Sequence, residues 1–211
     1  MREAGIGRVL VASLHEAISD LMPTRLDFYE HWLSPDDLRL GTFGLAPLNA
    51  VLSFLREEGE AYGSVMARAG TYAADWLLAG RRLHGSLGVL WLPAGIRARA
   101  AVRTVRRLIR ACYRDNRATI RLRRGAGTLE IRGSVFCTVR EPVAAPLCGF
   151  YQALAGRVLQ AYGLDATARV EACRATGAPA CQLAVAIDLR RKPGQAVEAS
   201  QPGIADRKPA S

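Results

Sequence analysis

Residues 167–188 read T-A-R-V-E-A-C-R-A-T-G-A-P-A-C-Q-L-A-V-A-I-D, and this stretch decides the fold class. Polar and apolar residues alternate along 167–173 and again along 181–188, the pattern of two half-buried β-strands. The seven residues between them include Gly177 and Pro179, two residue types that favour turns. The stretch therefore predicts an antiparallel hairpin.

A second alternating pair lies further towards the N-terminus. Residues 119–123 and 128–139 alternate in the same way, and G-A-G at 125–127 supplies a turn between them. Residues 147–162, between the two pairs, have the apolar spacing of a helix and end at Gly163. Two hairpins that flank one helix predict an α+β fold, in which helices cover one face of an antiparallel sheet.

The N-terminal half has the apolar periodicity of helices, which we expect to cover the sheet. Four longer helices are predicted, over residues 6–22, 46–56, 60–81 and 96–114, and residues 24–33 are predicted to form a short helix or to continue the first helix after a bend. We divide the chain into a helical N-terminal region, a central domain and a C-terminal tail. The tail is rich in proline and lacks apolar periodicity, so we expect it to be disordered. The three parts are residues 1–59, 60–188 and 189–211.

Composition narrows the class of protein further. The 211 residues are 50% hydrophobic and 23% charged, which is typical of a folded globular domain. No uncharged run reaches the ~18–20 residues that a membrane-spanning helix needs. Five cysteines, an odd number without a dense framework, favour a reducing compartment, so we expect a cytoplasmic protein.

The net charge of +10 comes from one segment. Eleven arginines and a single acid lie between Arg97 and Arg124, while basic and acidic residues balance elsewhere. On the predicted helix 96–114 a stripe of arginines lies apart from the apolar face. Two interpretations stay open. The stripe could face an anion, which could be nucleic acid, an anionic membrane, an acidic partner or the carboxylates of a ligand, or it could be the solvated face of an amphipathic helix. The stripe consists of Arg99, Arg103, Arg106 and Arg110.

Three of the five cysteines have positions that favour a metal site. Cys148 lies in the first turn of a predicted helix, where the helix dipole favours the thiolate. Cys173 and Cys181 flank the hairpin loop, so the fold can bring all three sulfurs to one end of the sheet. Thiolates suit Zn²⁺, which takes four tetrahedral ligands, and Glu171 is our candidate for the fourth.

The other two cysteines are predicted to be structural. Cys112 lies on the apolar face of the arginine-bearing helix, and Cys137 lies among alternating apolar residues of a predicted strand. A free cysteine in such a position usually packs as a small hydrophobic residue.

Two stretches of this sequence resemble the 4-vinyl reductase domain family. They are L-C-G-F-Y-Q-A-L-A-G-R-V-L at 147–159 and V-E-A-C-R-A-T-G-A-P-A-C-Q-L-A-V at 170–185. The run R-A-G-T-Y-A-A-D-W-L-L within 60–81 also resembles the central helix of that family. The family includes a bacteriochlorophyll-biosynthesis protein, sensor domains of phenol- and xylene-responsive activators, and archaeal hydrocarbon-binding proteins. It is related in fold to small subunits of the vesicle-tethering TRAPP complex.

The resemblance also implies a zinc site. Sensor-type members of the family bind zinc through three cysteines and a glutamate, and Cys148, Cys173 and Cys181 match those cysteines. Glu171 matches less well, because the family pattern would put its glutamate at the position of Val170. The fourth ligand is therefore the weakest part of the predicted site.

The resemblance implies a protein that binds an apolar, aromatic or tetrapyrrole ligand, with a possible role in bacteriochlorophyll biosynthesis and a homodimeric state. The alternative is a TRAPP-like scaffold or dimerisation module without a ligand. A pocket between the helices and the sheet would hold the ligand. The large residues predicted to line it are Trp76, Trp91, Phe136, Phe150 and Tyr151.

The sequence offers little support for catalysis. No G-x-G-x-x-G follows a predicted strand, and no motif marks a flavin, nicotinamide or iron–sulfur site. The three histidines, His15, His31 and His84, have no partners at the spacing of a catalytic triad or a metal site. We therefore expect a binding protein rather than an enzyme.

Overall fold

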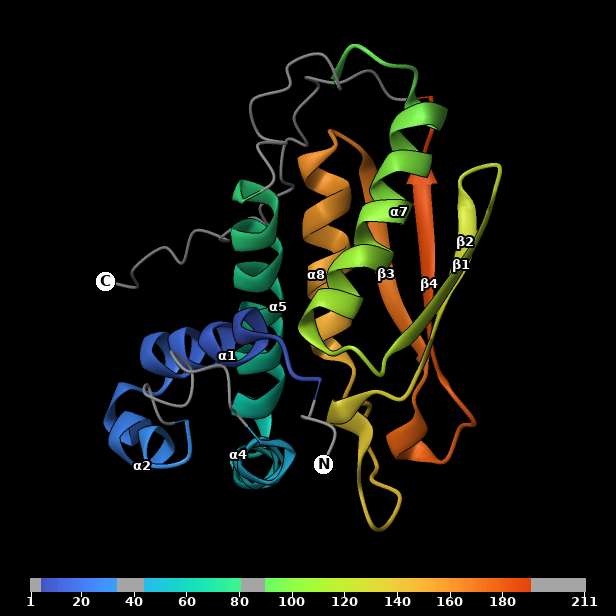
Figure 1. Ribbon diagram of the computed structural model, residues 1–211. Coiled ribbons are helices and arrows are strands. Elements are labelled where there is room, and N and C mark those ends of the chain that lie inside the picture. The colour runs from blue at the N-terminus through green and yellow to red at the C-terminus, as the bar shows by residue number, and fades with distance from the viewer. Residues whose placement is uncertain (1–4, 34–43, 81–89, 191–211) are drawn as a thin grey trace, which may run out of the picture.

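The computed structural model describes residues 5–33, 44–80 and 90–190 (Figure 1). The predicted tail 189–211 lies outside the described residues, apart from 189 and 190, and so does His84. In chain order the helices and strands are α1 (Arg8–Leu21), η1 (Pro23–Arg25), α2 (Leu26–Glu30), α4 (Leu45–Glu57), α5 (Glu60–Ala79), α7 (Ala94–Cys112), β1 (Arg117–Arg123), β2 (Ala126–Arg132), η3 (Val135–Cys137), α8 (Gly149–Ala161), β3 (Asp165–Ala172), η4 (Arg174–Thr176) and β4 (Cys181–Asp188).

The four strands form one antiparallel sheet in the order β1-β2-β4-β3. Each predicted hairpin is present, and pairing of β2 with β4 joins the two hairpins in the middle of the sheet, where Leu129 lies opposite Leu183. The prediction of an α+β fold with two hairpins that flank a helix is confirmed.

The helices lie in layers on one side of this sheet. Helices α7 and α8 lie side by side against the strands, α5 packs on α8, and α1 packs across α5 (Figure 1). Leu129, Leu183 and Val185 point from the strands into this core, whereas Thr167 and Arg169 on β3 are exposed. Among the described helices, none has the length and apolar character needed to span a bilayer.

The first hairpin turns earlier than its sequence indicates. Its two turn residues are Arg124 and Gly125, with φ values of 53° and 89°, and Ala126 already begins β2. Two residues with positive φ make the short turn whose twist matches that of paired strands. The prediction that β2 continues to Val139 is wrong beyond Arg132. Gly133, at a φ of 76°, ends the strand, and the chain then folds into η3.

Arg97 belongs to the core rather than to the arginine stripe. Its side chain is only 1% exposed. Its Nη1 donates hydrogen bonds to the carbonyl oxygens of Tyr162 and Gly163, at 2.8 and 2.7 Å, and its Nε donates to that of Leu92. Arg97 therefore caps the C-terminal end of α8, where a helix leaves carbonyl groups without partners.

Helices α5 and α8 approach closely at Gly70. A Cβ atom at this position would lie 2.3 Å from the carbonyl oxygen of Phe150 and 3.0 Å from the Cβ of Ala153. Gly70→Ala should therefore destabilise the fold by ~1–3 kcal/mol through overpacking, measured by urea unfolding. Gly63→Ala, in open space on the same helix, is the matched control and should stabilise by ~0.5–1 kcal/mol. Equal effects of the two substitutions would contradict this contact.

Candidate metal centre

Four cysteines from four segments meet at one end of the sheet. Cys137 ends η3, Cys148 is the N-cap of α8, Cys173 lies between β3 and η4, and Cys181 begins β4. The turns η3 and η4 both lie at the lower end of the molecule in Figure 1, below the sheet. The fold therefore brings residues that are far apart in sequence to a single point.

The four sulfur atoms have the separations of a metal site. The Sγ of Cys137 lies 3.3 Å from that of Cys148 and 3.4 Å from those of Cys173 and Cys181. The Cys148 and Cys173 sulfurs are 3.1 Å apart, and all four lie within 4.8 Å of one another. These contacts exceed the ~2.05 Å of a disulfide and approach the ~3.8 Å edge of a tetrahedron with ~2.3 Å Zn–S bonds. The four cysteines could therefore hold one metal ion.

The environment of the cluster favours thiolates at two of its members. All four cysteines are buried. Sulfur hydrogen bonds, first from Cys137 and then from Cys148, lower the pKa of Cys173 and of Cys181, whereas the contact with Cys137 raises the pKa of Cys148. The backbone N–H of Leu147 also donates to the Cys173 sulfur, at 3.4 Å. A cation that binds here would meet partial negative charge in a dry site.

The structure brings together the three predicted cysteines, but not Glu171. Glu171 is exposed on β3, and the fourth sulfur belongs to Cys137 instead. Glu171 alternates with inward residues along β3, so its side chain lies on the open face of the sheet. Gly133 is the residue from which the role of Cys137 could have been predicted. A strand that ends at Gly133 places Cys137 in the turn that follows, and not in the sheet. Cys112 stays apart on α7, where burial raises the pKa of its thiol to about 12.

The segment that carries Cys148 is held from both sides. The N–H of Val143 donates to the Ala175 carbonyl at 2.8 Å, which ties this segment to η4. The hydroxyl of Tyr62, on α5, donates to the Leu147 carbonyl at 3.1 Å. Leu147 is thus bonded to α5 through its carbonyl and to the Cys173 sulfur through its N–H.

A largely apolar pocket of about 540 Å³ adjoins the cluster. Its walls come from the start of α5, the end of α4 and the segment before Cys148. Arg56 contributes the one guanidinium of the lining, and its Nη2 donates to the carbonyl of Phe136, one residue before Cys137. The volume lies in the range of small-molecule sites. The lining residues are Arg56, Gly59, Glu60, Tyr62, Gly63, Val143, Ala145, Pro146 and Leu147.

The five aromatic residues predicted to line a pocket lie elsewhere. Phe136, Phe150 and Tyr151 are fully buried and pack against one another, with ring centroids 4.8–5.7 Å apart. Trp76 is partly exposed on α5 and stacks on Tyr72, and Trp91 is largely exposed. Large aromatic side chains are as suited to a packed core as to a ligand pocket, and three of these five, Phe136, Phe150 and Tyr151, pack in the core.

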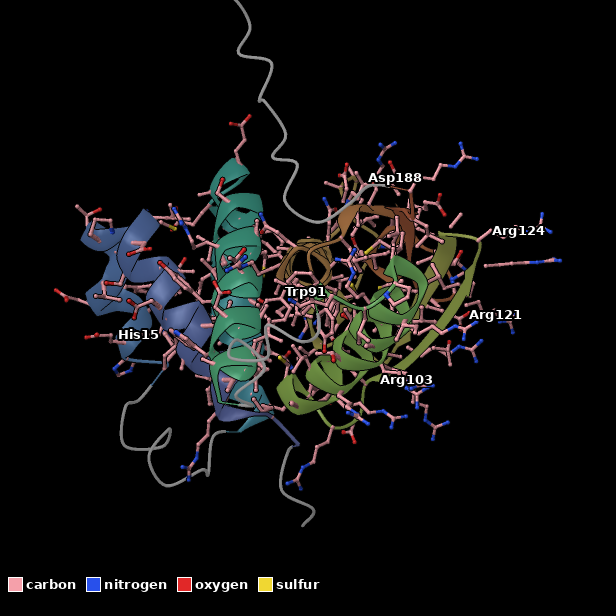
Figure 2. The ribbon with its side chains drawn as sticks, turned by 90° about the horizontal axis from the view of Figure 1, so that it is seen from above. His15, Trp91, Arg103, Arg121, Arg124 and Asp188 are labelled. Atoms are coloured by element: carbon pink, nitrogen blue, oxygen red, sulfur yellow. The ribbon has the colours of Figure 1, made fainter. Side chains whose placement is uncertain are left out.

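The predicted arginine stripe is on the surface. Five arginines of α7 are exposed, the four of the predicted stripe and Arg107, and those of β1 and its turn continue the positive surface beside them. In Figure 2, Arg103, Arg121 and Arg124 project outward from the same side of the molecule. The exposed arginines of the predicted stripe are Arg99, Arg103, Arg106 and Arg110.

Comparisons with known proteins find similarity in structure only. No protein-family model matches the chain, and no curated protein matches it. Two similar solved structures are of an H-NOX protein from S. oneidensis, one in the Fe(II)NO ligation state and one an Fe(II)-state triple mutant. Their TM-scores are 0.56 and 0.55 at 12% identity, over 87% of this chain and 99% and 96% of theirs. The chain therefore shares the fold of these proteins.

Proposed function

We propose that this protein is a small-molecule-binding module, of the sensor or accessory type, whose ligand pocket is built on a structural zinc site. The observation that carries the proposal is the position of Leu147. This residue lines the pocket and also donates its N–H to a sulfur of the cysteine cluster. A metal ion that draws the four sulfurs together would therefore fix one wall of the pocket.

Zinc is the metal that the cluster suits best. A metal ion held by all four buried sulfurs would have no open position, which is typical of a structural zinc site, and the Leu147 N–H supplies a hydrogen bond that a zinc-bound thiolate would accept. Iron is the other ion that four cysteines hold. The Fe(II)NO state named for the H-NOX structure is not carried over to this cluster, because four sulfurs would occupy every position of a tetrahedral ion.

The resemblance to 4-vinyl reductase domains supports the same function. The three cysteines that match that family all belong to the cluster, and the H-NOX-like fold accommodates them. We therefore propose a distant relationship to that family, with Cys137 in the role that a glutamate has in its sensor members. The ligand we propose is apolar and of the size of a substituted aromatic molecule, since the pocket walls are mostly apolar.

A pocket-filling substitution tests the ligand site. Gly63 lines the pocket, and a Cβ atom there meets nothing within 4 Å, so Gly63→Leu should fill the pocket without disturbing the fold. We expect spectroscopic titration to detect binding of phenols or naphthols, and Gly63→Leu to weaken it by about tenfold or more.

Gly156→Leu provides the matched control, because Gly156 on α8 also has open space and does not line the pocket. Porphyrins form a second arm of the titration. If neither aromatic nor porphyrin ligands bind, or if Gly63→Leu binds them as well as Gly156→Leu does, the pocket is not the ligand site.

A further inference from the structure

The turn that leads into α7 exposes apolar side chains to solvent. Trp91 is 88% exposed, Ile96 49%, Leu92 41% and Leu90 36%. Pro93 is the N-cap of the helix, so these four residues lie together at its first turn. We call residues 90, 91, 92 and 96 the apolar tip. Large apolar side chains grouped on a surface usually mark a contact with a partner or a membrane.

Arginines flank the apolar tip. Helix α7 runs from the tip to the cysteine-cluster end of the molecule, and β1 runs back beside it (Figure 1). The turn after β1, with Arg123 and Arg124, returns to the same end of the molecule, but Arg124 lies at the outer edge, apart from Trp91 (Figure 2). Arg99, Arg103 and Arg106 are exposed on α7, three, seven and ten residues after Ile96, a spacing that puts them on the same helix face as Ile96. We call these three the flanking arginines. Residues 99–124, all of which the structure describes, include one acidic residue, Asp115. It follows the C-terminal end of α7, the end away from the apolar tip.

Carboxylates at this end of the molecule lie nearer to the turn after β1 than to α7. Ile187 donates its backbone N–H to the carbonyl of Gly125, so Asp188 follows beside the turn that carries Arg124, whereas Arg99 and Arg103 belong to α7. Asp188 accepts a hydrogen bond from the N–H of Arg190. Among the described residues, the ion pairs of arginine involve Arg25, Arg132 and Arg157, none of which borders the tip. Within the part of the chain that the structure describes, no ion pair involves Arg99, Arg103 or Arg106, so their exposed guanidinium groups can meet an external anion.

We propose that the apolar tip and its flanking arginines attach this protein to an anionic membrane surface. Tryptophan and aliphatic side chains insert at the boundary between headgroups and acyl chains, and adjacent arginines bind lipid phosphates. A guanidinium is suited to this role because it can donate two parallel hydrogen bonds to one phosphate. Attachment of this kind lies on the membrane rather than across it.

The composition of the tip favours a membrane over nucleic acid. Trp91 could stack on a base, but Leu90, Leu92 and Ile96 have neither a ring to stack nor a group to read a base edge. These aliphatic side chains gain free energy only by leaving water, which a lipid surface allows. The arginines alone could bind either a membrane or nucleic acid, so the apolar side chains of the tip are the feature that favours a membrane.

This inference is independent of the proposed ligand and metal site. The cysteine cluster and its pocket lie at the opposite end of α7 from the tip (Figure 1). Loss of zinc or of ligand binding through pocket substitutions should leave membrane attachment unchanged, provided that the protein stays folded.

Co-sedimentation of the full chain with lipid vesicles tests the proposal. We expect binding to phosphatidylcholine vesicles that contain phosphatidylglycerol, and little binding to phosphatidylcholine alone. Trp91→Ser with Leu92→Ser should weaken binding about tenfold or more. Replacing three flanking arginines by glutamine should weaken binding by a similar factor or more and reduce its salt dependence. These arginines are Arg99, Arg103 and Arg106.

Matched controls distinguish membrane attachment through the tip from a general effect of positive charge or of any exposed apolar side chain. Trp76→Ser removes an exposed tryptophan on α5, and three exposed arginines away from the tip can be replaced by glutamine with the same loss of charge. Both controls should bind vesicles as the unchanged chain does. The control arginines are Arg140, Arg169 and Arg174.

Fluorescence locates the contact directly. In a chain with Trp32→Phe and Trp76→Phe, the emission of Trp91 should shift to the blue when anionic vesicles are added. Equal binding to neutral vesicles, unaltered binding by the tip variant, or binding to DNA without binding to vesicles would each overturn the proposal.

Discussion

Cys137→Ser is expected to remove bound zinc and most of the stability of this protein. The four sulfurs belong to η3, the start of α8, the β3–η4 junction and β4, so a metal ion bound to all four would fasten one end of the sheet to a helix. Structural zinc sites contribute on the order of 10 kcal/mol of binding free energy, comparable with the ~5–15 kcal/mol stability of a whole domain. Elemental analysis of the purified chain and its Tm with and without a chelator measure both effects.

Two substitutions serve as controls for Cys137→Ser. Cys112→Ser alters a buried cysteine outside the cluster, and we expect bound zinc to stay stoichiometric even though stability falls slightly. Glu171→Gln should change neither zinc content nor Tm, since its side chain is exposed on the open sheet face. Retention of zinc by Cys137→Ser, or its loss in Glu171→Gln, would contradict the four-cysteine site. Stoichiometric iron in place of zinc would contradict the choice of metal.

Arg97→Met is expected to destabilise the fold by ~2–5 kcal/mol, although it removes a charge from a chain with a large positive excess. The guanidinium donates to carbonyl groups of Leu92, Tyr162 and Gly163, which methionine leaves without partners. Unsatisfied buried carbonyls cost more than the repulsion that the substitution relieves. Urea unfolding at neutral pH measures the change.

Arg99→Met is the matched control, because Arg99 is exposed two residues further along the same helix. Its effect on stability should lie within about ±0.5 kcal/mol, as is usual at exposed positions. If Arg97→Met were as mild as Arg99→Met, the capping of α8 by Arg97 would not contribute to the fold.

Alternation and helical spacing were sufficient to predict most of the architecture. The strands can be recognised in the sequence because one face of the sheet is buried and the other is open. Polar residues such as Thr167 and Arg169 therefore occur at every second position of β3. The same alternation continues after Arg132 and led to the incorrect prediction of a longer strand there. Val135 and Cys137 continue the alternation, but Gly133 at positive φ turns the chain out of the sheet before they are reached.

The candidate site was harder to predict because it depends on how separate segments meet. Three cysteines could be grouped from one hairpin and the helix before it, yet Cys137 joins them only because η3 folds back beneath the sheet. The pocket walls include small residues, such as Gly63 and Ala145, which have no distinctive pattern in a sequence. Prediction from size favoured aromatic residues, and packing buried Phe150 in the core instead.

The double role of Leu147 has a thermodynamic consequence. If the pocket and the cysteine cluster are filled as proposed, the hydrogen bonds of Leu147 to Tyr62 and to the Cys173 sulfur would let occupancy of either site change the free energy of filling the other. Such coupling is reciprocal: whatever factor the metal adds to the ligand's affinity, the ligand must add to the metal's. A bound aromatic ligand would then slow the extraction of zinc by a chelator, and a molecule that responds to an apolar compound would report it as a change in metal retention.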